Sequence, residues 1–190
     1  MTLPVALLYN DWPNLPSRNY MCDGELGFLL TMLDRLQPKR MIEFGVNQGI
    51  TARAVLNNIE SIEYYLGIDV PFEHKMPIAG QQPEVPSEPG HLVKTDPRFD
   101  LFIRFNGVPD KSFVDNELFD VAFIDGDHSY AGVVTDYRLA RRMVRKGGLI
   151  LFHDYNNRTV DVTKALEDLH QNENRNLFNI NGTMLVYEQL

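Results

Sequence analysis

The chain has 190 residues, of which 44% are hydrophobic, and 26 acidic against 18 basic residues give a formal net charge of −8. These values predict one globular domain over residues 1–190 and disfavour nucleic acid as a partner. Cys22 is the single cysteine, which excludes an intramolecular disulfide. Without a recognisable signal peptide or a run of transmembrane length, we expect a cytoplasmic protein with no membrane partner.

The first part of the chain predicts an arm followed by alternating helices and strands. The arm covers residues 1–21 and contains three prolines. Asp23 is a suitable N-cap for a helix whose leucines recur at helical spacing. Strands are expected over 41–44 and 64–68, and they flank a glycine turn and a helix over 50–57.

A proline-rich insert follows the second strand. Residues 71–98 are expected to form this loop, because the stretch from Pro71 to Pro97 carries six of the eleven prolines and shows no sustained helical or strand period. A loop this long inside a compact domain is usually functional or disordered. The third strand is expected over 101–105.

The second part of the chain contains two apolar runs of strand length, VAFI over 121–124 and LILF over 149–152. The helix between them is expected to begin at the N-cap Ser129 and to end at Gly147 and Gly148, which open the next strand. This helix is long enough to make the two strands parallel neighbours.

The tail predicts a last helix over 159–170 and a hairpin around Asn181-Gly182. Alternating strands and helices with a terminal hairpin predict an α/β fold. We expect a doubly wound, mostly parallel, seven-stranded sheet of Rossmann-like form, with one antiparallel strand from the hairpin.

Polar groups follow the two apolar runs directly. Asp125, Asp127 and His128 come after the first run, and His153 and Asp154 come after the second. The carboxyl ends of neighbouring parallel strands meet at the crevice where open α/β sheets bind ligands. The sequence therefore predicts a site there.

A second signal lies at the turn from Gly45 to Gly49, between a strand and a helix. Free N–H groups at a helix N-terminus suit a carboxylate or phosphate, and Asp69 can accept hydrogen bonds from a ribose diol. A tight turn with no ligand is the alternative. The spacing G-x-x-x-G departs from the dinucleotide fingerprint G-x-G-x-x-G.

The motifs EFGVNQG, GID, FDVAFIDGDHSY and GGLILFHDY resemble the class I S-adenosylmethionine-dependent methyltransferases. The second half is similar to the small-molecule O-methyltransferases that include the macrocin and novobiocin-type sugar methyltransferases. The resemblance covers roughly 41–155, with a gap over the insert, and implies S-adenosylmethionine as cofactor. The implied cofactor residues are Glu43, Gly45, Asn47, Gly49, Asp69, Asn106 and Asp125. At Asn106 the usual acidic pattern of the family is missing.

In metal-dependent relatives, carboxylates at these strand ends bind a divalent ion such as Mg or Mn. The resemblance places the metal ligands at Asp125, His153 and Asp154. The family often has two acidic residues at the second pair, and an imidazole there favours manganese, iron, nickel or zinc over magnesium. If His153 instead points into the core or pairs with Asp127, the site holds metal weakly or not at all, so metal binding stays open.

Two residues are candidates for the catalytic base. Asp127 matches the position of the proposed base in the sugar-methylating relatives. His128 is the alternative, because its ordinary pKa lies near neutrality. A purely structural interpretation is that this short polar loop only caps the following helix.

The leading hypothesis is an O-methyltransferase that acts on a hydroxyl of a small molecule or sugar. Two alternatives are a binding protein that keeps the cofactor pocket without transfer activity, and a nicotinamide-dependent oxidoreductase, which we rank last. The acceptor, the metal and assembly into a homo-oligomer are left open.

Overall fold

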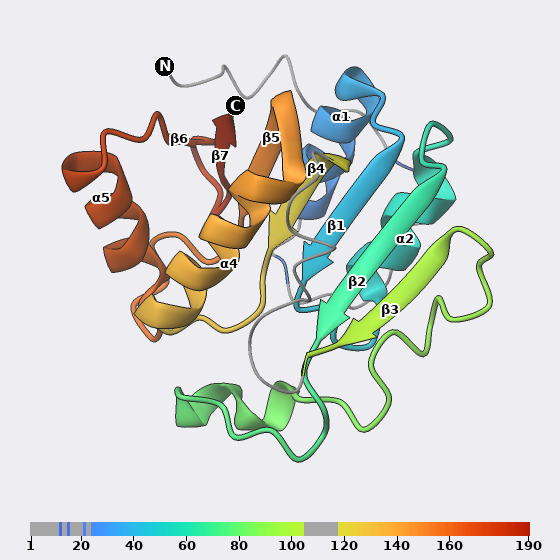
Figure 1. The fold of residues 1–190 in the computed structure, drawn as a ribbon, viewed down its shortest axis with the longest axis horizontal. Helices are drawn as coiled ribbons and strands as arrows, with labels where there is room; N and C mark the ends of the chain where they lie inside the picture. Colours follow the sequence, from blue (N-terminus) through green and yellow to red (C-terminus); the bar gives the residue numbers. More distant parts are fainter. Residues whose placement is uncertain (1–11, 13–14, 16–20, 22–23, 105–117) are drawn as a thin grey trace.

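A seven-stranded sheet organises the chain (Figure 1). The computed structural model describes residues 12, 15, 21, 24–104 and 118–190. The strands are β1 (Arg40–Phe44), β2 (Tyr64–Asp69), β3 (Phe99–Ile103), β4 (Phe119–Ile124), β5 (Val144–Phe152), β6 (Phe178–Asn179) and β7 (Val186–Gln189). Their order is β3-β2-β1-β4-β5-β7-β6. The first five strands pair in parallel, and β7 runs antiparallel to β5 and β6. The predicted mixed sheet with a terminal hairpin is confirmed.

Helices cover both faces of this sheet (Figure 1). They are α1 (Glu25–Leu36), α2 (Ile50–Asn58), α4 (Tyr130–Met143) and α5 (Val162–Asn172), with a short 3₁₀ helix η2 (Ala79–Glu84) in the insert. One apolar cluster joins α1 and α2 to the sheet, and a second joins α4 and α5 to the opposite face.

Neighbouring residues of one strand belong to different clusters. Met41 packs with α1 and α2, whereas Ile42 packs with α4 and α5. Val121 and Ala122 of β4 divide in the same way. Because side chains alternate across a strand, a strand that is buried on both faces must be apolar throughout. This explains the uninterrupted runs that the sequence shows for the central strands.

Several predicted boundaries move, and the last helix, expected over 159–170, is found at Val162–Asn172. The first helix begins at Glu25 with Gly24 at its N-cap, and Asp23 lies outside the described residues. β3 begins and ends two residues earlier than expected, at Phe99–Ile103. The prediction that Gly147 and Gly148 end a helix is wrong, because the helix stops at Met143 and both glycines lie inside β5.

Close packing is the reason for a glycine at position 148. A Cβ atom there would lie 2.5 Å from Val144 Cγ1 and 2.6 Å from the carbonyl oxygen of Asp120. The β4–β5 register shifts between Phe119 and Val121, next to this contact. Glycine at position 148 therefore allows β4 and β5 to approach closely next to the point where their register shifts.

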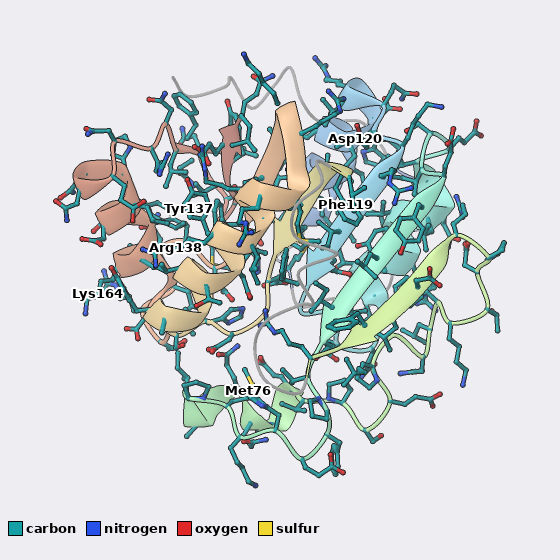
Figure 2. The ribbon with its side chains drawn as sticks, viewed as in Figure 1. Met76, Phe119, Asp120, Tyr137, Arg138 and Lys164 are labelled. Carbon is teal, nitrogen blue, oxygen red and sulfur yellow. The ribbon has the colours of Figure 1, made fainter. Side chains whose placement is uncertain are left out.

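The chain reverses its direction of sheet growth at β1, which has β2 on one side and β4 on the other. The carboxyl ends of β1 and β4 lie side by side at this switch point, where open α/β sheets bind ligands. The insert with η2 lies beyond these strand ends (Figure 1). In Figure 2, Met76 of the insert and Asp120 at the start of β4 mark the two opposite ends of the sheet. Within the described part of the chain, no helix is both long and apolar enough to cross a membrane.

Candidate active site

The glycine turn after β1 is pressed against the end of β4. Gly45 has φ 87°, and a Cβ atom on it would lie 2.3 Å from the carbonyl oxygen of Asp125. Its N–H donates to the carbonyl of Ile68 at 2.8 Å, and the N–H of Asp125 donates to the carbonyl of Phe44 at 2.9 Å. Only glycine meets both demands at position 45.

Asp69, at the end of β2, holds the same turn. Its Oδ2 accepts from the backbone N–H of Asn47 at 2.6 Å, and its Oδ1 accepts from that of Val70 at 2.7 Å. Burial raises the pKa of Asp69, although these backbone donors and Arg104 counteract the rise. Asn47 has φ 50°, a left-handed conformation that asparagine tolerates better than most residues. The turn and Asp69, the residue predicted to bind the ribose, therefore form one hydrogen-bonded unit.

This unit borders a cavity of about 280 Å³, the first cavity, at the ends of β1, β2 and β4. A second cavity of about 340 Å³ adjoins it and contains His128, His153 and Asp154 in its walls. The shared wall consists of Gly45, Asn47, Gln81, Glu84 and Asp125. Two ligands bound in these cavities would therefore meet near Asp125.

His128 bridges two carboxylates in the second cavity. Its Nε2 lies 3.3 Å from Asp125 Oδ1, and its Nδ1 lies 3.2 Å from Asp154 Oδ2. Burial opposes the charged imidazolium, but Asp125, Asp154 and Glu84 outweigh burial and raise the pKa of His128. The imidazole is thus a stronger base than an ordinary histidine.

His153 is buried between two other carboxylates. Its Nε2 lies 3.2 Å from Glu25 Oε2, and its Nδ1 lies 3.3 Å from Asp125 Oδ1. Burial lowers its pKa, yet these carboxylates and Asp154 raise the value to about 11. Conversely, the pKa of Asp125 is held well below its usual range, because His153 and His128 outweigh the effect of burial. His153 is therefore a buried cation at neutral pH.

Three side chains have the spacing of a metal site. Asp125, His128 and Asp154 each offer one ligand atom, and these atoms lie within 4.8 Å of one another. Asp154, two residues after the end of β5, has φ 64°, a left-handed conformation that is uncommon for a residue other than glycine. The structure thus brings Asp125 and Asp154 together as predicted, but the third candidate in this cluster is His128. His153 as a ligand stays a prediction, and its two carboxylate partners disfavour it.

The insert is hydrogen-bonded to both parts of the site. The carboxamide of Gln81 donates from Nε2 to the carbonyl of Gly126 and accepts at Oε1 from the N–H of His128, both at 3.0 Å. Asn47 Nδ2 donates to the carbonyl of Glu84 at 2.9 Å. η2 therefore supplies two residues of the shared wall and is held there by hydrogen bonds to the strand-end loops. Sequence reasoning missed Gln81 and Glu84, because they lie in a segment without a periodic pattern.

The remaining predicted residues have different surroundings. Asp127 lines the first cavity, and its Oδ1 accepts from the N–H of Ser129 at 2.9 Å. Glu43 lines neither cavity and accepts from the hydroxyl of Tyr65 at 2.9 Å. Burial raises the pKa of Glu43 well above its usual range. Gly49 forms the N-cap of α2, and Asn106 lies outside the described residues.

A sequence model of a family described as methyltransferase domain matches residues 42–155, more than half of the chain. A curated relative, uncharacterized protein R132 of Acanthamoeba polyphaga mimivirus, is 53% identical over 36 residues. That match covers 19% of this chain and only 16% of the relative, so it supports no argument about the whole protein.

Solved structures share the fold at low sequence identity. A Staphylococcus aureus protein proposed to be a caffeoyl-CoA O-methyltransferase has TM-score 0.62 and 13% identity, over 93% of this chain and 86% of its own. The O-methyltransferase from Bacillus cereus in complex with SAH has TM-score 0.57 and 14% identity, over 93% and 85%. The O-methyltransferase NovP has TM-score 0.57 and 14% identity, over 85% and 78%. The chain therefore belongs to the methyltransferase domain family, with the fold of the class I S-adenosylmethionine-dependent methyltransferases.

Proposed function

We propose that this enzyme transfers the methyl group of S-adenosylmethionine to a hydroxyl of a small molecule or sugar. The observation that carries the proposal is the shared wall at Asp125, with the first cavity beside Asp69 on one side and the second cavity, which His128 lines, on the other. In this arrangement the cofactor occupies the first cavity, and the acceptor occupies the second. The sulfonium methyl group would then point across the wall toward the acceptor oxygen.

Methyl transfer is an in-line displacement at the methyl carbon. The acceptor oxygen forms a bond to the methyl carbon while the bond to sulfur breaks, and S-adenosylhomocysteine leaves as a neutral thioether. No acid is needed for this departure. The enzyme must align the three reacting atoms and remove the hydroxyl proton.

We assign proton removal to His128 rather than to Asp127. His128 lines the second cavity, and the carboxylates of Asp125 and Asp154 on either side of its ring would stabilise the imidazolium that forms when it accepts a proton. Asp127 lines the first cavity, and one of its oxygens already accepts from Ser129. Gln81 holds the backbone of His128 in place by accepting its N–H.

A divalent ion fits the same side chains. Asp125, His128 and Asp154 would hold it, and two carboxylates with one imidazole suit Mn²⁺ better than Mg²⁺. When bound, the ion would lower the pKa of an acceptor hydroxyl. A histidine that ligates through the reactive nitrogen cannot also accept the proton there, so metal dependence decides which use His128 serves.

Calorimetric titration with S-adenosylhomocysteine and with NAD tests the cofactor. We expect binding of S-adenosylhomocysteine, and we expect Asp69→Ala to weaken it by about tenfold or more, because hydrogen bonds to a charged acceptor are strong. Binding of NAD without a response to S-adenosylhomocysteine would identify an oxidoreductase instead.

Transfer of a radiolabelled methyl group to a panel of hydroxylated acceptors tests the chemistry. We expect His128→Asn to bind S-adenosylhomocysteine normally and to lose about 100-fold or more in turnover. If Asp127→Asn shows that loss and His128→Asn does not, Asp127 is the base. Cofactor binding with no transfer to any acceptor would favour a binding protein.

A further inference from the structure

A buried ion pair forms part of the wall of the first cavity. Arg104, directly after β3, donates from Nη1 to Asp136 Oδ1 of α4 at 2.6 Å. The Asp136 side chain is 1% exposed and that of Arg104 is 12% exposed. Both residues line the first cavity together with Asp69. The pair therefore lines the same cavity as Asp69, the residue proposed to bind the ribose.

The second carboxylate oxygen of Asp136 is an unused acceptor. Among the described residues, no donor reaches the buried Oδ2 atom. Burial raises the pKa of Asp136, and Arg104 counteracts this effect. An unpaired carboxylate oxygen is costly in a protein interior, and because Asp136 lines the first cavity, a ligand bound there is the candidate source of the missing donor.

The backbone of Gly126 borders this oxygen. Gly126 lies beside Asp136, and a Cβ atom on Gly126 would already lie 3.4 Å from Oδ2. Glycine at position 126 therefore keeps this part of the wall free of side-chain atoms.

The pair presents an acceptor next to a donor. Asp136 Oδ2 can accept one hydrogen bond, and the guanidinium of Arg104 carries five N–H donors in a planar fork. Adenine presents the complementary pattern, because its exocyclic N6 amine donates and its adjacent ring nitrogen accepts. Hypoxanthine reverses this pattern, since O6 accepts and the ring N1–H donates.

We propose that Arg104 and Asp136 recognise the adenine edge of the cofactor, and that Asp136 makes the site specific for adenine over hypoxanthine. This inference rests on the proposed function. Asn106, which the resemblance placed near the adenine, is not acidic, and here the carboxylate comes from α4 instead. In hypoxanthine, O6 would face Asp136 Oδ2, so two acceptors would meet without a proton between them.

The test is a comparison of two nucleosides by calorimetry. S-adenosylhomocysteine and its deaminated analogue S-inosylhomocysteine are titrated into the wild type, Asp136→Asn and Asp96→Asn. We expect the wild type to prefer the adenine compound by about tenfold or more. In Asp136→Asn this preference should shrink by at least about tenfold, because the amide nitrogen can donate to O6.

Asp96→Asn is the matched control. Asp96 pairs with Arg98 at 2.7 Å and lines neither cavity, so its loss should leave the preference unchanged. Thermal melting shows whether each variant is folded, and Asp136→Glu provides a second variant that retains the carboxylate and should retain the adenine preference.

The outcomes separate this inference from the proposed function. If Asp136→Asn weakens both nucleosides equally, the pair is only structural and the inference is overturned. If the wild type binds the two compounds equally well, adenine recognition by Asp136 is also overturned, although the methyltransferase proposal stands. If the wild type binds neither compound, the proposed function fails and this inference fails with it.

Discussion

Glu25 Oε2 lies 3.2 Å from His153 Nε2, and 128 positions of sequence separate the two residues. Both side chains are buried, and Glu25 Oε1 also accepts from the N–H of Met184. With Asp125 on the other side of its ring, His153 is protonated at neutral pH. The positive charge of His153 therefore stabilises the ionised carboxylate of Asp125, which lines both cavities.

This buried cation predicts a pH dependence of stability. Folding raises the pKa of His153 from 6.5 to about 11, so protonated His153 stabilises the folded state. The contribution is fully present below pH 6.5 and is lost as pH rises toward 11. Glu25→Gln removes one carboxylate, and we expect it to lower the free energy of unfolding at pH 7 by about 1–3 kcal/mol.

Urea unfolding at several pH values between 6 and 10 measures this effect. The stability of Glu25→Gln should fall less steeply with pH than that of the wild type, since His153 then has a smaller shift. Glu63→Gln, which removes the partner of Lys39 in an exposed pair, should match the wild type. Parallel curves for Glu25→Gln and the wild type would show that Glu25 contributes nothing to the raised pKa of His153.

The turn after β1 predicts a large effect of Gly45→Ala. The substitution combines strain at φ 87° with a Cβ atom 2.3 Å from the carbonyl oxygen of Asp125. We expect a loss of at least about 2 kcal/mol in the free energy of unfolding, together with weaker binding of S-adenosylhomocysteine. Chemical unfolding and calorimetry measure the two losses.

Gly182→Ala is the matched control for this comparison. Gly182 has φ 84°, but no atom lies within 4 Å of the position that its Cβ would occupy. It should therefore show the conformational cost alone and leave cofactor binding unchanged. Equal losses in the two variants would mean that the contact with Asp125 contributes nothing.

The hydrogen bonds of Gln81 predict that the insert positions the loop that carries His128. Gln81→Leu loses both hydrogen bonds to Gly126 and His128, and we expect turnover to fall by about tenfold, because a small displacement of His128 misaligns the reacting atoms. Gln82→Leu is the control, because Gln82 makes two similar bonds within the insert, to His74 and Met76. A similar fall in both variants would attribute the effect to the insert as a whole.

Metal binding has a specific pattern of expected losses. If the cluster binds Mn²⁺, Asp154→Asn and His128→Asn should each weaken binding by about tenfold or more, since losses of this size already follow from changes outside the ligand set. Calorimetry with Mn²⁺ after treatment with a chelator measures this. Unchanged turnover after removal of metal would assign His128 to proton transfer alone.

Local patterns in the sequence were sufficient to predict the order of the elements and to propose candidate residues at the strand ends. Apolar runs, Ser129 as a cap and the Asn181-Gly182 turn are local signals, and the structure has a strand, a helix and a hairpin where they predict them. Asp69 and Asp125 were predicted as site residues because each stands at the end of an expected strand. Strand ends that converge at one edge of a parallel sheet make such residues neighbours.

Only the tertiary structure decided which side chains pair at that edge. The sequence predicted His153 as a metal ligand, and only the tertiary structure shows that Asp125 and Glu25, the latter 128 positions away in the sequence, flank its ring and raise its pKa. Asp136 is a charged residue on a helix, and only the tertiary structure shows that it is buried beside Arg104. The local sequence thus determines which helices and strands form. The pKa values of buried groups, and which of their atoms lack a hydrogen-bond partner, depend instead on neighbours that are distant in the sequence and that no local pattern encodes.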